Sequence, residues 1–434
     1  MMNFLAAIAC FALSASFQGE SPKVSLAEAI RLANTHSTAI HLALDELDVA
    51  SARLGQRNSK GLPNIALSGS GTRFDDVTNV KFGASTIQFL PEHQEQLSLA
   101  LTQDLNISGY VSATIAQAKL GVMAAKYAVD AATQDQALAT TSAFYAVRRA
   151  EQAVGVAKAS LDDYKQQFDT TTKLFKGGVG QKIDVYRAQS QVADAERELT
   201  RRLNDLSSAK SSLNDQLGRP LDNPLDLVEP STAERMPDVL VPSDREKLIA
   251  QALDRRSEAL AAHIQVAAAE KGIKIAQAAN GVSASVSVSG THYPTTSFAT
   301  PRENVGALTL MVSVPIFDGG LGRSQVNEAK AMVQSAKEQE SQTRRAISLQ
   351  VQKASLDLET TRQSYVAAKV ALTAAEAARK LAQQRYEAQV ALYLEVTDAQ
   401  AALASAQAGL VDATYDLIIA QARLSRALSQ PITH

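Results

Sequence analysis

Apolar and polar side chains alternate with a period of two in several short segments of the chain. Residues 282–289 read V-S-A-S-V-S-V-S, and residues 97–102 and 308–314 place leucine or valine at every second position. Successive side chains of a β-strand point to opposite faces, so this alternation predicts strands with one apolar face and one face of small polar residues. We predict strands at about 64–72, 97–106, 282–291 and 307–316.

The segments that follow the second and fourth strands have a different period. Apolar residues step by four and three within 143–164 and 347–375, and larger apolar residues alternate with alanine within 396–427. This heptad spacing predicts helices that approach one another closely, as coiled-coil packing requires. We predict long helices at about 109–176 and 320–387, each followed by a shorter helix, at about 182–217 and 393–429.

One unit occurs twice along the chain. Gly109 aligns with Gly320, an offset of 211 residues that holds without a gap as far as Leu213 and Leu424. Each copy is expected to run helix, strand, strand, long helix, helix, and a stretch rich in proline separates the copies. We predict a first repeat at 17–217, a linker at 218–245 and a second repeat at 246–434.

The N-terminal segment has the layout of a secretory signal peptide. An apolar run from Phe4 to Leu13 is followed by small residues, although no Lys or Arg precedes the run. We expect a signal peptide at 1–16, cleaved after Ser16. The alternative is lipidation of Cys10, which would need a lipobox that here lacks its usual leucine. No later run reaches the ~20 apolar residues of a membrane helix, which leaves a periplasmic, secreted or outer-membrane β-barrel protein.

The alternating strands fit two environments. Segments of about 9–11 residues with this pattern suit a membrane barrel that faces lipid outside and water inside. A soluble sandwich shows the same alternation, because its polar face also meets water. One isolated strand favours the sandwich, whereas four strands behind a signal peptide favour the barrel. The predicted fold class is therefore mainly α with a membrane β-barrel.

Composition and motifs argue against an enzyme and against a nucleic-acid-binding protein. The formal net charge is −2 and no long run of one sign occurs, so nucleic acid is not an expected partner. The glycine-rich segment 177–182 lacks the spacing of a phosphate loop, and the six histidines are scattered without metal-ligand spacing. No nucleophile has a base partner and no methionine cluster suggests copper or silver export. We expect no catalytic residue, metal or cofactor.

Four segments carry a resemblance to a known family. Residues 25–34 read S-L-A-E-A-I-R-L-A-N, 62–69 read L-P-N-I-A-L-S-G, 175–189 read F-K-G-G-V-G-Q-K-I-D-V-Y-R-A-Q, and 314–320 read V-P-I-F-D-G-G. Together with the signal peptide and the duplicated unit, they resemble the TolC-type outer-membrane efflux family over essentially the whole mature chain.

The resemblance implies a homotrimer in the outer membrane of a Gram-negative bacterium. Each chain would give four strands to one 12-stranded β-barrel, which would continue into a long α-helical tunnel in the periplasm. Outer-membrane lipid, a periplasmic adaptor (membrane fusion) protein and, through it, an inner-membrane pump are the implied partners. Closure agrees with physical chemistry, because a four-stranded sheet in lipid cannot leave its edges unpaired.

The resemblance also implies two kinds of site near the periplasmic helix turns. The turns would dock the adaptor, although the second departs from the family's Val-Gly pair, and the glycines have the alternative role of only letting the chain reverse. The docking candidates are Gly177, Gly178, Val179, Gly180, Gln389, Val390 and Ala391. Side chains near the turns would narrow the tunnel, and the candidates are Asp169, Lys173, Lys176, Lys380, Arg385 and Glu387.

A joint between strand and long helix is expected in each copy. Pro315 suits the end of a strand because it has no ladder N–H, and Asp318 is a candidate N-cap. Gly319 and Gly320 allow a sharp change of direction, as Gly109 does in the first copy.

The leading functional hypothesis is an exit duct of a tripartite efflux pump of the RND, ABC or MFS type, or of a type I secretion system. The alternative is a soluble periplasmic coiled-coil adaptor or scaffold, which leaves the four amphipathic strands unexplained. A general diffusion porin is a third reading, opposed by the small amount of strand sequence.

Overall fold

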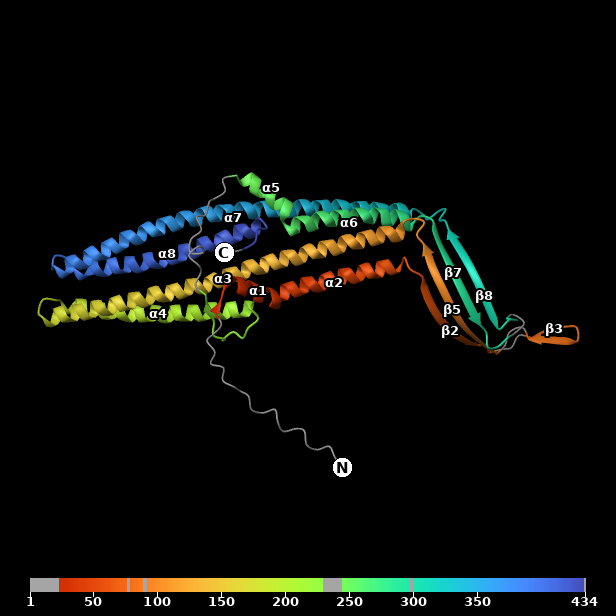
Figure 1. Ribbon diagram of the computed structural model, residues 1–434, viewed down its shortest axis with the longest axis horizontal. Helices are drawn as coiled ribbons and strands as arrows, with labels where there is room; N and C mark the ends of the chain where they lie inside the picture. Colours follow the sequence, from red (N-terminus) through yellow and green to blue (C-terminus); the bar gives the residue numbers. More distant parts are fainter. Residues whose placement is uncertain (1–22, 76–78, 89–91, 229–243, 297–299, 433–434) are drawn as a thin grey trace, which may run out of the picture. The chain divides into compact units, whose positions relative to one another are not determined.

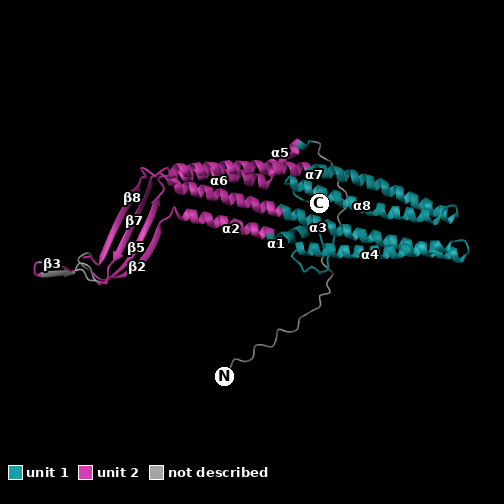
Figure 2. Cartoon of the chain, turned by 180° about the vertical axis from the view of Figure 1, so that it is seen from behind, with its two compact units in different colours: residues 1–38, 134–245, 353–434 teal, residues 39–133, 246–352 magenta. Residues whose placement is uncertain are grey.

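The computed structural model describes residues 23–75, 79–88, 92–228, 244–296 and 300–432 (Figure 1). The expected signal peptide with Cys10, and part of the expected linker, lie outside these residues. The chain divides into two compact units, one of residues 1–38, 134–245 and 353–434 and the other of residues 39–133 and 246–352 (Figure 2). We call them the helical unit and the strand unit.

The helical unit contains two pairs of adjacent helices. The C-terminal part of α3 (Tyr110–Lys176) lies beside α4 (Lys182–Gln216), and that of α7 (Leu321–Glu387) lies beside α8 (Tyr393–Ala427) (Figure 1). The residues that step by four and three face the interior: Val147, Leu161, Leu358 and Leu417 are each 6% exposed or less. The heptad positions read from the sequence therefore form the packed seams.

A small apolar core closes one end of the helical unit. Helix α1 (Leu26–His36) begins at Ser25, whose Oγ accepts a hydrogen bond from the Glu28 N–H at 3.3 Å, the signature of an N-cap. Its buried Ala33 packs in one cluster with Phe144 and Leu213. Strands β1 (Lys23–Val24) and β6 (Asp226–Leu227) pair in parallel beside this core.

The strand unit contains a four-stranded antiparallel sheet in the order β2-β5-β7-β8. It also holds most of α2 (Thr38–Ser59) and α5 (Arg245–Arg255), and all of α6 (Ser257–Ala279). The strands are β2 (Asn64–Arg73), β5 (His93–Leu105), β7 (Ser283–His292) and β8 (Asn304–Ser313).

The ends of the strands differ from the sequence prediction. Strand β5 begins at His93 rather than at 97, and β8 runs from Asn304 to Ser313 rather than from 307 to 316. Pairing sets these ends: Arg73 pairs with His93, and Ser283 pairs with Ser313. The interval between β2 and β5, for which no strand is predicted, also holds a small hairpin made of β3 (Asn79–Phe82) and β4 (Ser85–Gln88).

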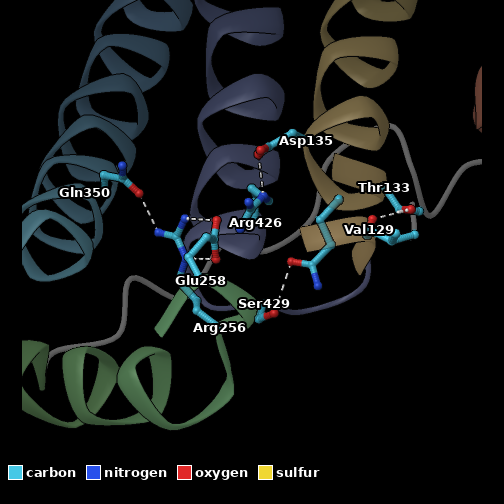
Figure 3. Close-up of polar contacts among 9 residues, drawn as sticks. Val129, Thr133, Asp135, Arg256, Glu258, Gln350, Arg426 and Ser429 are labelled. Carbon is cyan, nitrogen blue, oxygen red and sulfur yellow. Dashed lines mark hydrogen bonds and ion pairs between the residues drawn. The ribbon is translucent and has the colours of Figure 1, made fainter. Parts of the chain in front are cut away.

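Each unit has a buried arginine that joins helix ends to a long helix (Figure 3). In the strand unit, Arg256 is 5% exposed, pairs with Glu258 at 2.7 Å and donates to Gln350 of α7. In the helical unit, Arg426 of α8 pairs with Asp135 of α3 at 2.7 Å. A buried charge persists only when it is paired in this way.

Candidate functional site: helix turns and strand-to-helix joints

The turn between α3 and α4 closes on one carbonyl. The N–H groups of Val179 and Gly180 both donate to the Leu174 oxygen, at 3.1 and 3.0 Å, and Gly178 has φ +77°. This is the usual left-handed termination of a helix. A Cβ at position 180 would lie 2.8 Å from the Phe175 nitrogen, so this position accepts only glycine without displacement.

The turn between α7 and α8 reaches a similar path with different residues. Gln389 takes the left-handed conformation, with φ +61°, which an ordinary side chain adopts at some energetic cost. The Val390 N–H donates to the Arg385 oxygen at 3.0 Å. Ala391 stands where the first turn has Gly180, and within the described contacts it makes no second bond to that oxygen. At the equivalent position of the first turn, a Cβ would meet the helix backbone.

Apolar side chains are exposed at both turns. Val179 is 60% exposed and Val390 is 66% exposed, and Ile183, Tyr186 and Leu392 beside them are exposed as well. Contiguous exposed apolar surface commonly marks a contact site for another molecule.

The six candidate constriction residues all lie on exposed parts of α3 and α7 in the helical unit. Asp169 pairs with Lys173 on the same helix, and Glu387 accepts a hydrogen bond from Gln383 at 2.7 Å. Arg385 pairs at 3.1 Å with Glu395 of α8, a residue that the sequence reasoning did not single out. Lys176 and Lys380 are exposed, one near the end of each long helix.

A buried tyrosine follows the second turn. Tyr393 is 2% exposed, its hydroxyl donates to Gln191 Oε1 of α4 at 3.0 Å, and its ring centre lies 5.6 Å from that of Tyr386. Burial, followed by the neighbouring Tyr386, raises the pKa of Tyr393 to about 12. This contact ties the start of α8 to α4.

A polar cluster joins three of the helices further along. Gln400 of α8 is buried, donates to Asp163 Oδ2 of α3 at 3.0 Å and accepts from Arg379 Nε of α7 at 3.1 Å. Arg379 and Asp163 are also an ion pair, at 3.5 Å. None of these three residues is a candidate site residue from the sequence. One signal was present, because Gln400 aligns with Gln189 at the offset of the internal repeat.

The strand-to-helix joints lie in the strand unit. Asp318 accepts hydrogen bonds from the N–H groups of Gly320 and Gly322, at 2.8 and 2.7 Å. The donation from Gly322, then that from Gly320, lowers the pKa of the Asp318 carboxyl. Gly319 and Gly320 have φ +64° and +90°, and Pro315 lies beyond the last residue of β8.

The first joint uses an asparagine in place of the aspartate. The Asn106 Oδ1 accepts from the Val111 N–H at 3.0 Å, and Gly109 has φ +76°. Both long helices therefore start from a side-chain cap followed by a left-handed glycine.

The described residues contain no group of three or more His, Cys, Asp and Glu side chains placed to hold a metal ion. Among the helices that the structure describes, none is both long and apolar enough to cross a membrane.

The described residues contain two pairs of adjacent helices and a four-stranded sheet with one apolar face. The solved structure of CusC, a protein that forms a transmembrane channel, has this fold. Its TM-score to this chain is 0.82 at 17% identity, over 96% of both chains. The profile of the outer membrane efflux protein family matches residues 29–219 and 248–430, so the chain belongs to that family.

Two characterised relatives align over most of their length. The chain is 26% identical to protein CyaE of Bordetella pertussis over 399 residues, which cover 88% of this chain and 79% of that protein. It is 23% identical to the outer membrane protein TolC of Escherichia coli K12 over 430 residues, which cover 95% and 83%. Proteins of this family act in efflux through the outer membrane, and it is a family of channels rather than of enzymes.

Proposed function

We propose that three copies of this duplicated chain form a passive exit duct through the outer membrane of a Gram-negative bacterium. Each chain gives four strands to a closed barrel of twelve, and the long helices continue as a tunnel in the periplasm. One observation carries the proposal: strands β2 and β8, each 10 residues long, are the two edges of a sheet whose apolar face is open. Leu67 on β2 and Leu308 on β8 are 68% and 75% exposed.

Closure by neighbouring copies satisfies both features of this sheet. An unpaired edge presents free N–H and C=O groups, which are too costly to leave in lipid. Pairing of β2 with β8 of the next copy removes every edge, and lipid covers the apolar side chains. A soluble scaffold, the other hypothesis, would leave this apolar face in water.

The helix turns suit an adaptor protein, which would couple the duct to an inner-membrane pump. The exposed apolar pair Val179 and Val390 supports this role. We assign the candidate narrowing of the tunnel to the charged residues near the turns, among them Arg385 with its partner Glu395. Opening would separate the packed helices there, a change between two arrangements of one interface.

Purified protein in a planar bilayer tests the duct. Native mass spectrometry in detergent should give a trimer, and the trimer should produce discrete conductance steps. A protein that fractionates as a soluble monomer without detergent would refute the proposal.

A matched pair of variants tests the docking role separately. Val390→Asp should leave the trimer intact but abolish complementation of efflux in cells that lack the channel, because a carboxylate in an apolar contact must be desolvated. Val370→Asp is the control, since Val370 lies on α7, away from the turn, and is similarly exposed at 65%. Equal activity of the two variants, both shown to be trimeric, would contradict docking at the turn.

A further inference from the structure

The register of the sheet separates its side chains into two faces of different chemistry. Leu101 pairs with Ile65 and with Val288, and Val288 pairs with Leu308, so these residues share one face. The other face of the sheet holds every second residue of four ranges, counted from the first residue of each: 64–72, 94–102, 283–291 and 305–313.

The second face, called the hydroxyl face below, carries no ionisable side chain within those four ranges. Most of its residues are serine or threonine, and the remainder are Ala, Asn, Gln, Val and Met. The hydroxyls meet one another across strands, as Thr291 Oγ1 donates to Ser98 Oγ at 3.2 Å. The face is therefore polar and neutral.

The ionisable residues of the four strands fall elsewhere. Arg73, His93, Glu95 and His292 have the register of the apolar face and lie at its end away from the long helices. The one acidic residue that shares the register of the hydroxyl face is Asp104, which pairs with Ser285 at the end next to α3.

The chemistry of such a lining has a direct consequence for permeation. Rings of charged side chains select ions of opposite sign in a pore. A hydroxyl group both donates and accepts hydrogen bonds, so it solvates cations and anions alike. A lining of hydroxyls without fixed charge gives neither sign an advantage.

We propose that the hydroxyl face lines the duct and makes its strand section a charge-neutral passage, bounded on the helix side by one Asp104 from each copy. This inference rests on the proposed trimeric duct. Cargo of either sign, or of none, passes the strand section, and selection by charge is confined to the level of Asp104 and to the helical part.

Two neighbouring residues provide a matched test of the face assignment. Ser287→Cys places a thiol on the hydroxyl face, whereas Val288→Cys places one on the apolar face. Cys10 is the only cysteine of the sequence and lies in the expected signal peptide, so the unsubstituted protein serves as the blank. In liposomes, a water-soluble charged methanethiosulfonate should label Ser287→Cys at least about tenfold faster, because the reactive thiolate does not form in hydrocarbon. Faster labelling of Val288→Cys would overturn the assignment.

Conductance in a salt gradient tests neutrality. On Ser287→Cys, a negative adduct should raise and a positive adduct should lower the ratio of potassium to chloride permeability, each by about twofold or more. Ser287→Ala should leave the ratio unchanged, and Asp104→Asn should lower it. A shift with Ser287→Ala, or no shift with either adduct in a conducting channel, would refute the proposal. If Ser287→Cys and Val288→Cys are labelled as expected but neither they nor the unsubstituted protein ever conduct, the duct is refuted while the face assignment is supported.

Discussion

Replacement of Gly180 by alanine tests the account of the first helix turn. The added Cβ would lie 2.8 Å from the Phe175 nitrogen and 3.1 Å from the Leu174 carbonyl carbon. Both neighbours are backbone atoms of the helix end, so residue 180 must move away. Its N–H then loses the 3.0 Å bond to the Leu174 oxygen.

The lost hydrogen bond and the steric overlap together set the free energy by which Gly180→Ala destabilises the turn. A lost hydrogen bond costs about 1 kcal/mol and overpacking about 1–3 kcal/mol, together about 2–4 kcal/mol. Because the turn can open locally without unfolding the helices, the loss appears as faster amide exchange in residues 174–184. Each 1.4 kcal/mol is a factor of ten, so exchange there should rise roughly 30- to 1000-fold.

Hydrogen–deuterium exchange read by mass spectrometry measures this rise. Gly155→Ala is the control, because a Cβ at position 155 in α3 meets nothing within 4 Å, and alanine should favour the helix by about 1 kcal/mol. Ala391→Gly gives the reverse change, and it should slow exchange in the second turn by permitting the missing bond. Exchange in residues 174–184 that stays within about threefold of the original in Gly180→Ala would refute the reasoning, since threefold is under 1 kcal/mol.

Three further predictions concern stability, measured by the loss of helical circular dichroism on unfolding. Arg256→Met should cost about 2 kcal/mol because it removes a buried cation and its 2.7 Å bond to the half-buried Glu258, whereas Arg245→Met removes an exposed pair at 3.1 Å and should cost under about 1 kcal/mol; equal losses would contradict this difference in burial. Gln389→Gly should stabilise by about 1 kcal/mol, because glycine takes φ +61° freely, and no gain would show that the turn is unstrained. Burial raises the pKa of Tyr393 from 10.0 to about 12, so its stabilising contribution is present below pH 10 and lost as the pH rises toward 12. The stability of Tyr393→Phe should therefore fall less over that pH range than that of the unsubstituted protein. Equal losses of stability in the two proteins would contradict this prediction.

The periodic features were predictable from the sequence, because period reports which face of an element is buried. The stepping residues Val147 and Leu358 are buried, as the heptads indicate. The strand ends were not predictable in this way. Alternation continues through Val314, yet β8 stops at Ser313, where its pairing with Ser283 of β7 ends.

The polar contacts between helices were also beyond the sequence. Arg379, Asp163 and Gln400 come from three helices, and their meeting depends on which helix lies beside which. The sequence of one chain contains the periods of each helix but not the rotation that brings particular polar residues together. Ion pairs such as Arg385 with Glu395 are unpredictable for the same reason.

The two helix turns separate what chain reversal requires from what it does not. Both turns place a residue with positive φ at the same step, Gly178 in one and Gln389 in the other, so the geometry demands the conformation and not the glycine. Glycine is needed at position 180 for a different reason, because a Cβ there would meet the backbone of Leu174 and Phe175. Chain reversal makes no use of a large exposed apolar side chain, yet both turns have one, Val179 and Val390. The case for a partner at the turns therefore rests on these valines rather than on the glycines beside them.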